Sequence, residues 1–165
     1  MKKKLFSEIY LEIKKFKKKQ KYFFLSTPKI SIIIPKIKNK FIVVSQKRIP
    51  INRTIFEFPG GIVDKGKTPI QIAFSELKEE TGYISLKKPK KIISFYPDPG
   101  RLNCSYECYY TDSLKKIGLP EKGIKLHLLN KRQILHLIQN KKFSHSCHVS
   151  AFLYLCNQNK YLSDK

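Results

Sequence analysis

Near the start of the chain, apolar residues recur every three to four positions. Leu5, Ile9, Ile13 and Phe16 carry this spacing, and lysines are frequent around them. The pattern predicts a basic amphipathic helix over residues 1–20, because residues three and four apart share one face of a helix. We expect this helix to pack on the rest of the chain or on a second subunit. Attachment to a membrane surface is the alternative.

Short runs of β-branched and aromatic residues, bounded by Pro, Gly and Asn, follow from residue 21 onward. Such runs predict strands, and three segments predict helices. The predicted strands are Tyr22–Leu25, Ile30–Ile34, Phe41–Ser45, Ile55–Phe58, Lys91–Phe95, Ser105–Thr111 and Ile124–Leu129, and the predicted helices are residues 69–81, 131–140 and 147–158. Strands interleaved with a few helices indicate one layered α/β or α+β domain over residues 21–160.

The helix predicted over residues 69–81 has signals at both ends. Thr68 suits the N-cap, Pro69 suits the first helical position, and Gln71 completes a capping box with Thr68. Gly82 suits the left-handed position that ends a helix. The apolar residues repeat at i, i+3, i+4 and i+7, so we expect this helix to be buried along the side formed by Ile70, Ala73, Phe74 and Leu77.

Three carboxylates crowd together near the end of this helix. Glu76, Glu79 and Glu80 stand at i, i+3 and i+4, where like charges repel and weaken a helix unless a cation lies among them. Mg²⁺ prefers carboxylate oxygens and keeps several of its waters. A solvated acidic face is the common alternative, but the chain has only 12 acidic residues and places three of them within five positions. The pattern therefore predicts a divalent-metal site.

The stretch from Gly61 to Tyr83 resembles the Nudix box, whose pattern is G-x5-E-x7-R-E-U-x-E-E-x-G-U with U apolar. Two positions depart from it, because Lys67 stands where the family has Glu and Ser75 stands where it has Arg. These two family residues support each other and the metal site, so their joint exchange leaves no unpaired charge behind. The pattern residues that are present are Gly61, Glu76, Leu77, Glu79, Glu80 and Gly82.

The resemblance extends outside the box, from about Ile30 to Leu155. The segment from Glu57 to Gly61 is similar to the E-[LF]-P-[AG]-G of ADP-ribose pyrophosphatases, and Gln46 to Arg48 is similar to their Q-x-R. Asp98 to Cys104 is similar to a segment of ADP-sugar pyrophosphatases. The resemblance implies a Nudix-type α/β/α sandwich with a mixed central sheet. It also implies Mg²⁺-dependent hydrolysis of a nucleoside-diphosphate sugar such as ADP-ribose, giving a nucleoside monophosphate and a sugar phosphate.

This resemblance implies a metal site and a catalytic base. Glu76 and Glu80 are expected as the principal ligands of Mg²⁺, with Mn²⁺ as the alternative ion. Glu79 is expected as a third ligand or as a group that orients water, and the backbone carbonyl of Gly60 as a further contact. The general base is expected at Glu121, with Glu79 or metal-bound hydroxide as alternatives.

Five further residues are expected to contact the substrate by the same resemblance. Arg48 suits a phosphate group, although a plain surface cation is an equal alternative. Glu57 suits metal-bound water or substrate hydroxyls. Gln46, Gly100 and Asn103 complete this set.

The net charge of +22 favours phosphate-rich partners, nucleic acid and anionic membranes among them. However, only four of the 34 cationic residues are arginine, and the lysines are spread along the whole chain. Dedicated phosphate and base recognition favours arginine, so the charge indicates a general compositional bias more than a binding footprint. A small-molecule nucleotide is therefore the expected partner, with nucleic acid as the minor alternative.

The cysteines and histidines predict no second site. No run approaches the roughly 18 apolar residues of a membrane span, and no export signal is recognised, so a cytoplasmic location with reduced thiols is expected. Cys104 and Cys108 fall four apart on a predicted strand, too far apart for one zinc ion to bind both easily. We expect buried structural thiols and assign no role to His127, His136 and His145.

Two alternatives to the main hypothesis remain open. The chain could hydrolyse another nucleotide: a nucleoside triphosphate, a dinucleotide or an RNA end. It could also be a nucleotide-binding Nudix module that has lost turnover, which Lys67 and Ser75 favour. Relatives in this branch commonly form dimers through N-terminal strands, so a homodimer is an expectation from the resemblance.

Overall fold

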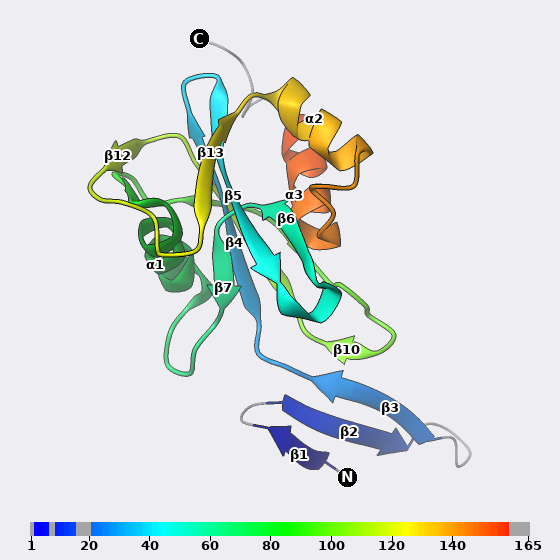
Figure 1. Cartoon of the computed structure of the whole chain (residues 1–165). Helices are drawn as coiled ribbons and strands as arrows, with labels where there is room; N and C mark the ends of the chain where they lie inside the picture. Colours follow the sequence, from blue (N-terminus) through cyan, green and yellow to red (C-terminus); the bar gives the residue numbers. More distant parts are fainter. Residues whose placement is uncertain (1, 7–8, 16–20, 159–165) are drawn as a thin grey trace.

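The structure is a computed structural model that describes residues 2–6, 9–15 and 21–158 (Figure 1). The strands are β1 (Lys2–Phe6), β2 (Ile9–Lys15), β3 (Lys21–Ser26), β4 (Ile30–Ile37), β5 (Lys40–Arg48), β6 (Arg53–Glu57), β7 (Gly60–Ile62), β8 (Tyr83–Ser85), β9 (Lys90–Phe95), β10 (Leu102–Asn103), β11 (Tyr106–Thr111), β12 (Leu114–Lys116) and β13 (Lys125–Leu129). The helices are α1 (Pro69–Thr81), α2 (Lys131–Gln139) and α3 (Ser146–Cys156), and a 3₁₀ turn covers Ile49–Ile51.

The centre of the molecule is a mixed sheet with helices on both faces. Its strand order is β13-β5-β4-β11-β9, with β6 paired to β5 and β7 paired to β4. β11 runs parallel to β4, and its other neighbour β9 is antiparallel. α1 covers one face, and α2 with α3 covers the other (Figure 1). The predicted α/β/α sandwich with a mixed central sheet is confirmed.

Strand β4 supplies both halves of the core, because successive side chains of a strand point to opposite faces. Ile33 joins the cluster that contains Ala73 and Leu77 of α1. Ile32 and Ile34 join the larger cluster under α2 and α3. All three isoleucines are fully buried, so β4 is a rigid support for whatever is attached to its edges.

Helix α1 begins and ends where its sequence signals predict. The Thr68 backbone N–H donates to the Gln71 side chain at 2.8 Å, and Pro69 takes the first turn. Gly82 ends the helix with a left-handed φ of 73° and donates its N–H to the Lys78 carbonyl. A Cβ at Gly82 would also overlap the Gly118 carbonyl. The direction in which the last turn of α1 points is therefore well determined.

The predicted N-terminal helix over residues 1–20 is wrong. Residues 2–6 and 9–15 form antiparallel strands, β1 and β2, and β2 continues the pairing with β3. Residues 7–8 and 16–20 lie outside the described residues. The physical reason is that apolar Ile9, Leu11 and Ile13 also recur at every second position, as in a strand. The edge of β3 that does not pair with β10 then offers β2 a set of backbone hydrogen bonds.

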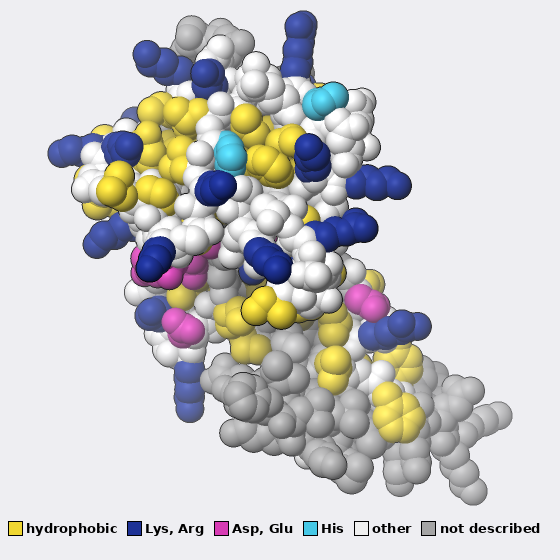
Figure 2. Space-filling view, in the orientation of Figure 1, with side chains coloured by type: hydrophobic (Ala, Val, Ile, Leu, Met, Phe, Trp, Pro, Cys, Tyr) yellow, Lys and Arg dark blue, Asp and Glu magenta, His cyan; other side chains and the backbone are white. Residues whose placement is uncertain are grey.

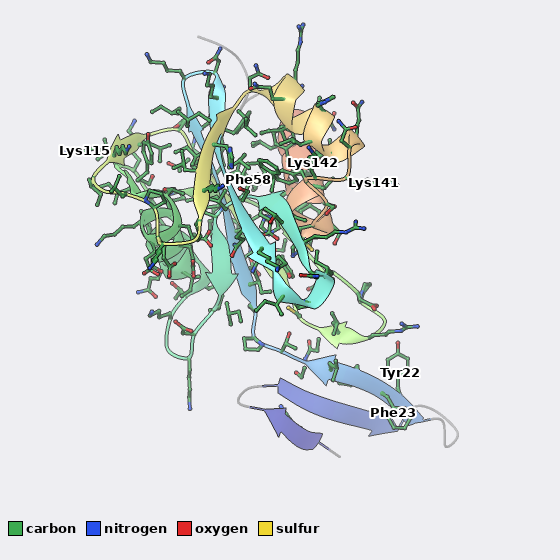
Figure 3. The ribbon with its side chains drawn as sticks, in the orientation of Figure 1. Tyr22, Phe23, Phe58, Lys115, Lys141 and Lys142 are labelled. Atoms are coloured by element: carbon green, nitrogen blue, oxygen red, sulfur yellow. The ribbon has the colours of Figure 1, made fainter. Side chains whose placement is uncertain are left out.

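The N-terminal strands belong to a second sheet of order β1-β2-β3-β10. β10 runs parallel to β3 and links this sheet to the rest of the chain. Tyr22 of β3 points toward the loop before β10 (Figure 3) and donates a hydrogen bond to the Gly100 carbonyl. The second sheet thus contacts the loop that contains Gly100, one of the residues predicted to contact the substrate.

The lysine-rich composition is visible on the surface. Figure 2 shows Lys and Arg side chains scattered over one face, and most acidic side chains in view gathered in one place. Among the residues that the structure describes, no helix is long and apolar enough to cross a membrane.

Candidate active site

The hairpin of β5 and β6 places three predicted substrate residues on one face of the sheet. Glu57 lies opposite Val44 in the register of these strands. Side chains two apart on a strand point the same way, and directly opposed residues share a face. Gln46, Arg48 and Glu57 therefore project together, although at least nine positions separate Glu57 from either of the others.

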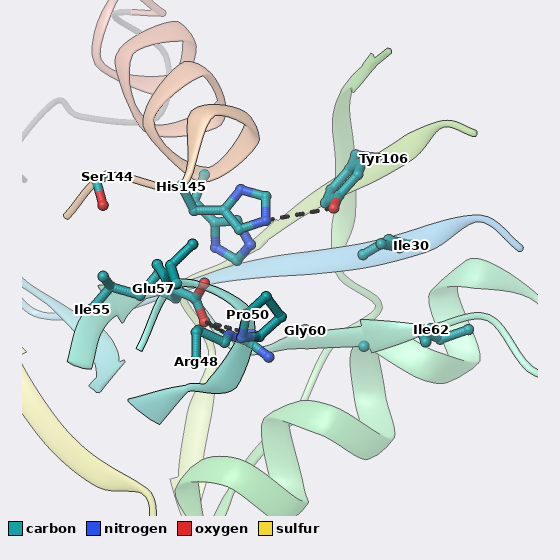
Figure 4. A pocket seen from close by; sticks show the side chains of 13 residues that line it. Ile30, Arg48, Pro50, Ile55, Glu57, Gly60, Ile62, Tyr106, Ser144 and His145 are labelled. Carbon is teal, nitrogen blue, oxygen red and sulfur yellow. Dashed lines mark hydrogen bonds and ion pairs between the residues drawn. The ribbon is translucent and has the colours of Figure 1, made fainter. Parts of the chain in front are cut away.

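Glu57 and Arg48 form an ion pair at this face (Figure 4). Arg48 donates from Nε at 2.9 Å and from Nη2 at 2.5 Å, both to Oε2 of Glu57. The Glu57 side chain is 1% exposed and the Arg48 side chain 41%. The other carboxylate oxygen, Oε1, is buried and has no hydrogen-bond partner among residues 2–6, 9–15 and 21–158. Arg48 thus compensates the buried charge on one side and leaves one acceptor unused.

Glu80 is the buried member of the acidic set on α1. Its carboxylate accepts a hydrogen bond from the Gly60 backbone N–H at 3.1 Å. Gln46 Nε2 lies 3.4 Å from both Glu80 Oε1 and Glu57 Oε2, so it bridges the two carboxylates. Burial raises the pKa of Glu80 to about 7, and the Gly60 hydrogen bond only partly opposes this. A buried carboxylate whose charge is so poorly compensated fits a bound cation.

The Glu76 side chain faces Gly61, and the Glu79 side chain is exposed to solvent. A Cβ at Gly61 would overlap the Glu76 carboxylate, so glycine is required there. Burial raises the pKa of Glu76, and the neighbouring charges of Glu79 and Glu121 add to the rise. The Glu121 backbone N–H donates to the Glu79 carbonyl at 2.9 Å. Glu121, the expected general base, lies on a loop far away in the sequence. The structure therefore brings it to the edge of the acidic cluster.

The two residues that depart from the box pattern have separate partners. Lys67 Nζ pairs with Asp64 at 3.2 Å, and both side chains are exposed. Ser75 turns back onto its own helix and donates to the Gln71 and Ile72 carbonyls. Neither side chain leaves an unpaired buried charge. This agrees with the expectation that replacing the family's Glu and Arg together, by Lys67 and Ser75, leaves no charge without a partner.

A pocket of about 420 Å³ opens beside the ion pair of Arg48 and Glu57. Arg48, Glu57, Gly60 and Gly61 line it, together with apolar residues of β4, β6 and the 3₁₀ turn. His145 (Figure 4) lines it as well. So does His148, which lies one turn further along the start of α3. From the sequence, no role is predicted for His145 and no function for His148. No local pattern could have indicated them, because about 90 residues separate them from Glu57.

Gly100 and Asn103 do not line this pocket. They lie in a second one of about 380 Å³, with aromatic walls from Tyr22, Phe24 and Tyr96. The structure therefore separates the predicted substrate residues into two groups. Gln46, Arg48 and Glu57 join the acidic cluster, and Gly100 and Asn103 join the second sheet.

The arrangement has a counterpart in known proteins. Residues 26–134 match the NUDIX domain family. This chain belongs to the Nudix family. The box on α1, with its carboxylates turned toward Gly60 and Gly61, is therefore the Nudix box of this chain, and the predicted family is confirmed.

Among curated relatives of this Nudix chain, the ADP-ribose pyrophosphatase of Bacillus subtilis is 44% identical over 71 residues, which is 43% of this chain and 38% of that protein. The ADP-sugar pyrophosphatase of Mus musculus is 37% identical over 67 residues, 39% of this chain and 29% of that protein. Both matches span less than half of the relative's own length.

The fold has a close match among solved structures. The crystal structure of an ADP compounds hydrolase superposes with a TM-score of 0.79, covering 95% of this chain and 88% of that chain at 15% sequence identity. At this level of identity the likeness shows the Nudix fold alone.

Proposed function

We propose that this chain hydrolyses the pyrophosphate bond of a nucleoside-diphosphate sugar such as ADP-ribose, with Mg²⁺ as cofactor, and releases a nucleoside monophosphate and a sugar phosphate. One observation carries the proposal. Gln46 bridges Glu57 and Glu80 at 3.4 Å on each side. This bridge joins the acidic end of α1 to the hairpin that carries Arg48, so groups suited to a cation and to a phosphate lie next to each other, and Arg48, Glu57 and Gly60 line the pocket beside them.

The residues present fit a hard divalent ion. Glu76, Glu79 and Glu80 offer carboxylate oxygens, which Mg²⁺ and Mn²⁺ prefer, and the Gly60 carbonyl is the further contact that the family resemblance implies. The raised pKa values of Glu76 and Glu80 mean that their charged forms lack compensation. When bound, the ion supplies charge neutralisation at the diphosphate and a more acidic water.

The chain's own residues hold the substrate and accept the proton. Arg48, with 41% of its side chain exposed, binds a phosphate oxygen with the part of its guanidinium that Glu57 leaves free. Glu121 lies in an exposed loop hydrogen-bonded to the Glu79 carbonyl. There it accepts the proton of the water that attacks phosphorus, with Glu79 as the alternative base.

The sugar-nucleotide class is favoured over other nucleotides by two lines of support. The B. subtilis and mouse relatives carry names of ADP-ribose and ADP-sugar pyrophosphatases. Gln46, Arg48 and Glu57, which belong to the segments on which that branch is recognised, project from one face of the β5–β6 hairpin, and Arg48 and Glu57 line the pocket. A nucleotide-binding module without turnover is the second candidate, and the observation that favours it is the exchange to Lys67 and Ser75 in the box.

A substrate panel tests this proposal. Purified protein is incubated with Mg²⁺ and, separately, with ADP-ribose, ADP-glucose, NADH and nucleoside triphosphates, and the products are separated by ion-exchange chromatography. We expect AMP and a sugar phosphate from ADP-ribose or ADP-glucose, and none when Mg²⁺ is chelated. Turnover of triphosphates alone would overturn the substrate class. Nucleotide binding without any product would establish the binding module instead.

A further inference from the structure

Three polar side chains meet where α3 borders the pocket. Glu57, His145 and His148 each place one atom suited to metal binding within 4.8 Å of the other two. Glu57 is 1% and His148 4% exposed. Within the part of the chain that the structure describes, two buried atoms lack a hydrogen-bond partner: Oε1 of Glu57 and Nδ1 of His145. A buried polar atom without a partner costs about 1–3 kcal/mol, so this arrangement calls for a ligand.

The hydrogen bonds of His148 decide what kind of group it can bind. The Phe58 backbone N–H donates to Nδ1 of His148 at 3.0 Å, so the ring must carry its proton on Nε2. Burial also lowers the pKa of His148 and keeps the ring neutral. The remaining polar group of His148 is therefore an N–H donor, and not a lone pair.

This protonation disfavours a metal ion at the trio. Two lone-pair ligands remain, on Glu57 and His145, and the third ring presents a proton that the ion would have to expel. A phosphate group also fits poorly, because its oxygens cannot donate to the Glu57 carboxylate and carry the same charge. A neutral group that both donates and accepts is required.

A sugar hydroxyl meets this requirement, since it accepts from the N–H of His148 and donates to Oε1 of Glu57. A second hydroxyl on the adjacent carbon can donate to Nδ1 of His145, whose Nε2 lies 3.5 Å from the Tyr106 hydroxyl. Tyr106 and Ile30 line the same pocket and offer apolar surface to the C–H face of a sugar ring (Figure 4).

The geometry points to a hydroxyl-binding subsite, formed by Glu57, His145 and His148, for the sugar that the diphosphate links to the nucleoside. The inference rests on the proposed function and deepens it. Gln46 joins Glu57 to Glu80, and Gly60 lies between the pocket and Glu80. The subsite thus borders the acidic cluster, where a sugar bonded directly to the diphosphate must lie.

The test compares two compounds that share the ADP part and differ in whether the second group carries hydroxyls. One is ADP-ribose, and the other is the pentyl ester of ADP, which keeps the diphosphate and has no hydroxyl on the second group. In the wild type, kcat/KM should be on the order of 100-fold or more higher for ADP-ribose, because the ester leaves buried polar groups unpaired. In His148→Phe the preference should fall below about 10-fold.

Two variants separate recognition from folding. His145→Phe keeps the bond between Phe58 and His148 and should also lower the preference, while His136→Phe, on the exposed side of α2, should not change it. A merely structural role would lower kcat/KM for both compounds equally and leave their ratio unchanged. An unchanged ratio in both pocket variants overturns the subsite.

If the wild type hydrolyses neither compound, the proposed function is refuted, but the subsite is not. Binding measurements then test the subsite. The affinities of ADP-ribose and the pentyl ester are then measured by calorimetry in a chelating buffer. A preference for ADP-ribose that His148→Phe removes supports the subsite, and equal affinities overturn it. Stoichiometric Zn²⁺ binding that depends on His148 would overturn it in favour of a metal site.

Discussion

The two halves of the candidate site are built in different ways. The acidic half lies on one turn of α1, where Glu76, Glu79 and Glu80 are neighbours by helical geometry alone. The other half, the hairpin half, joins Arg48 and Glu57 of the β5–β6 hairpin to His145 and His148 at the start of α3. Only the packing of the fold brings these four residues together. The first half is encoded locally, and the second depends on the complete fold.

This difference also appears in how each half treats buried charge. Glu57 is ion-paired with Arg48, whereas the Glu80 carboxylate accepts from a backbone N–H and, at 3.4 Å, from the amide of Gln46. Charge in the hairpin half is compensated by the protein, whereas in the proposed function a bound cation compensates the charge of the acidic half. The predictions below test that contrast.

The largest effect is expected from Glu80→Gln. Loss of this carboxylate should lower kcat by about 10³-fold, because the variant loses one of the proposed metal ligands. The far-ultraviolet circular dichroism spectrum should stay unchanged, since glutamine keeps the acceptor for the Gly60 N–H. Asp64→Asn, which breaks only an exposed ion pair, is the matched control and should stay near wild type. Near-wild-type turnover in Glu80→Gln would remove the metal-site assignment.

A smaller effect is expected in the pH dependence of stability without metal. The pKa of Glu80 is about 7 in the folded protein, against an ordinary value of 4.5, so the folded state binds the proton more tightly than the unfolded state. The stabilisation is complete below pH 4.5 and is lost as pH rises through 7. Its size is on the order of 3 kcal/mol.

Urea unfolding in chelating buffer between pH 5 and 8 measures this loss. Mg²⁺ should restore stability at pH 8, where the carboxylate is ionised, and have little effect at pH 5. Glu80→Gln should lack this component of the pH dependence. If wild type and variant show the same slope, Glu80 is not the buried acid that the structure indicates.

The smallest effect concerns the hairpin half. Arg48→Met leaves the buried Glu57 carboxylate without its partner and should lower the free energy of unfolding by about 2 kcal/mol. Adding Glu57→Leu should recover much of this loss, because the unpaired charge is then gone. Arg53→Met, at the exposed register partner of Arg48, serves as control. Equal losses in the single and double variants would show that Arg48 acts through packing and not through charge.

What the sequence could predict follows the same division. The bounds of α1 and the placement of its carboxylates follow from local signals: Thr68 and Pro69 at one end, Gly82 at the other. The strands from β3 to β13 with clear β-branched runs were also predictable. The short strands β7, β8, β10 and β12 were not, because two or three residues form a strand only when a partner edge is already present.

The failures have physical causes as well. Residues 9–15 satisfy helical and strand spacing equally, and only the open edge of β3 decides between them. His145 and His148 carry no local pattern, since their place depends on how α3 packs on Phe58, whose ring lies 5.8 Å from that of Phe152. The separation of Gly100 and Asn103 from Arg48 is likewise a consequence of the second sheet.

The two adjacent glycines before α1 have a consequence for mutational tolerance. A side chain at Gly60 would collide with the Ser31 carbonyl, and one at Gly61 with the Glu76 carboxylate. At Gly66 a Cβ would meet open space, and only the φ of 83° favours glycine there. The connection to α1 is thus tightly packed at its beginning and open a few residues later. Substitutions such as Lys67, which stands where the family pattern has glutamate, can occur in the open part without reshaping the carboxylate cluster.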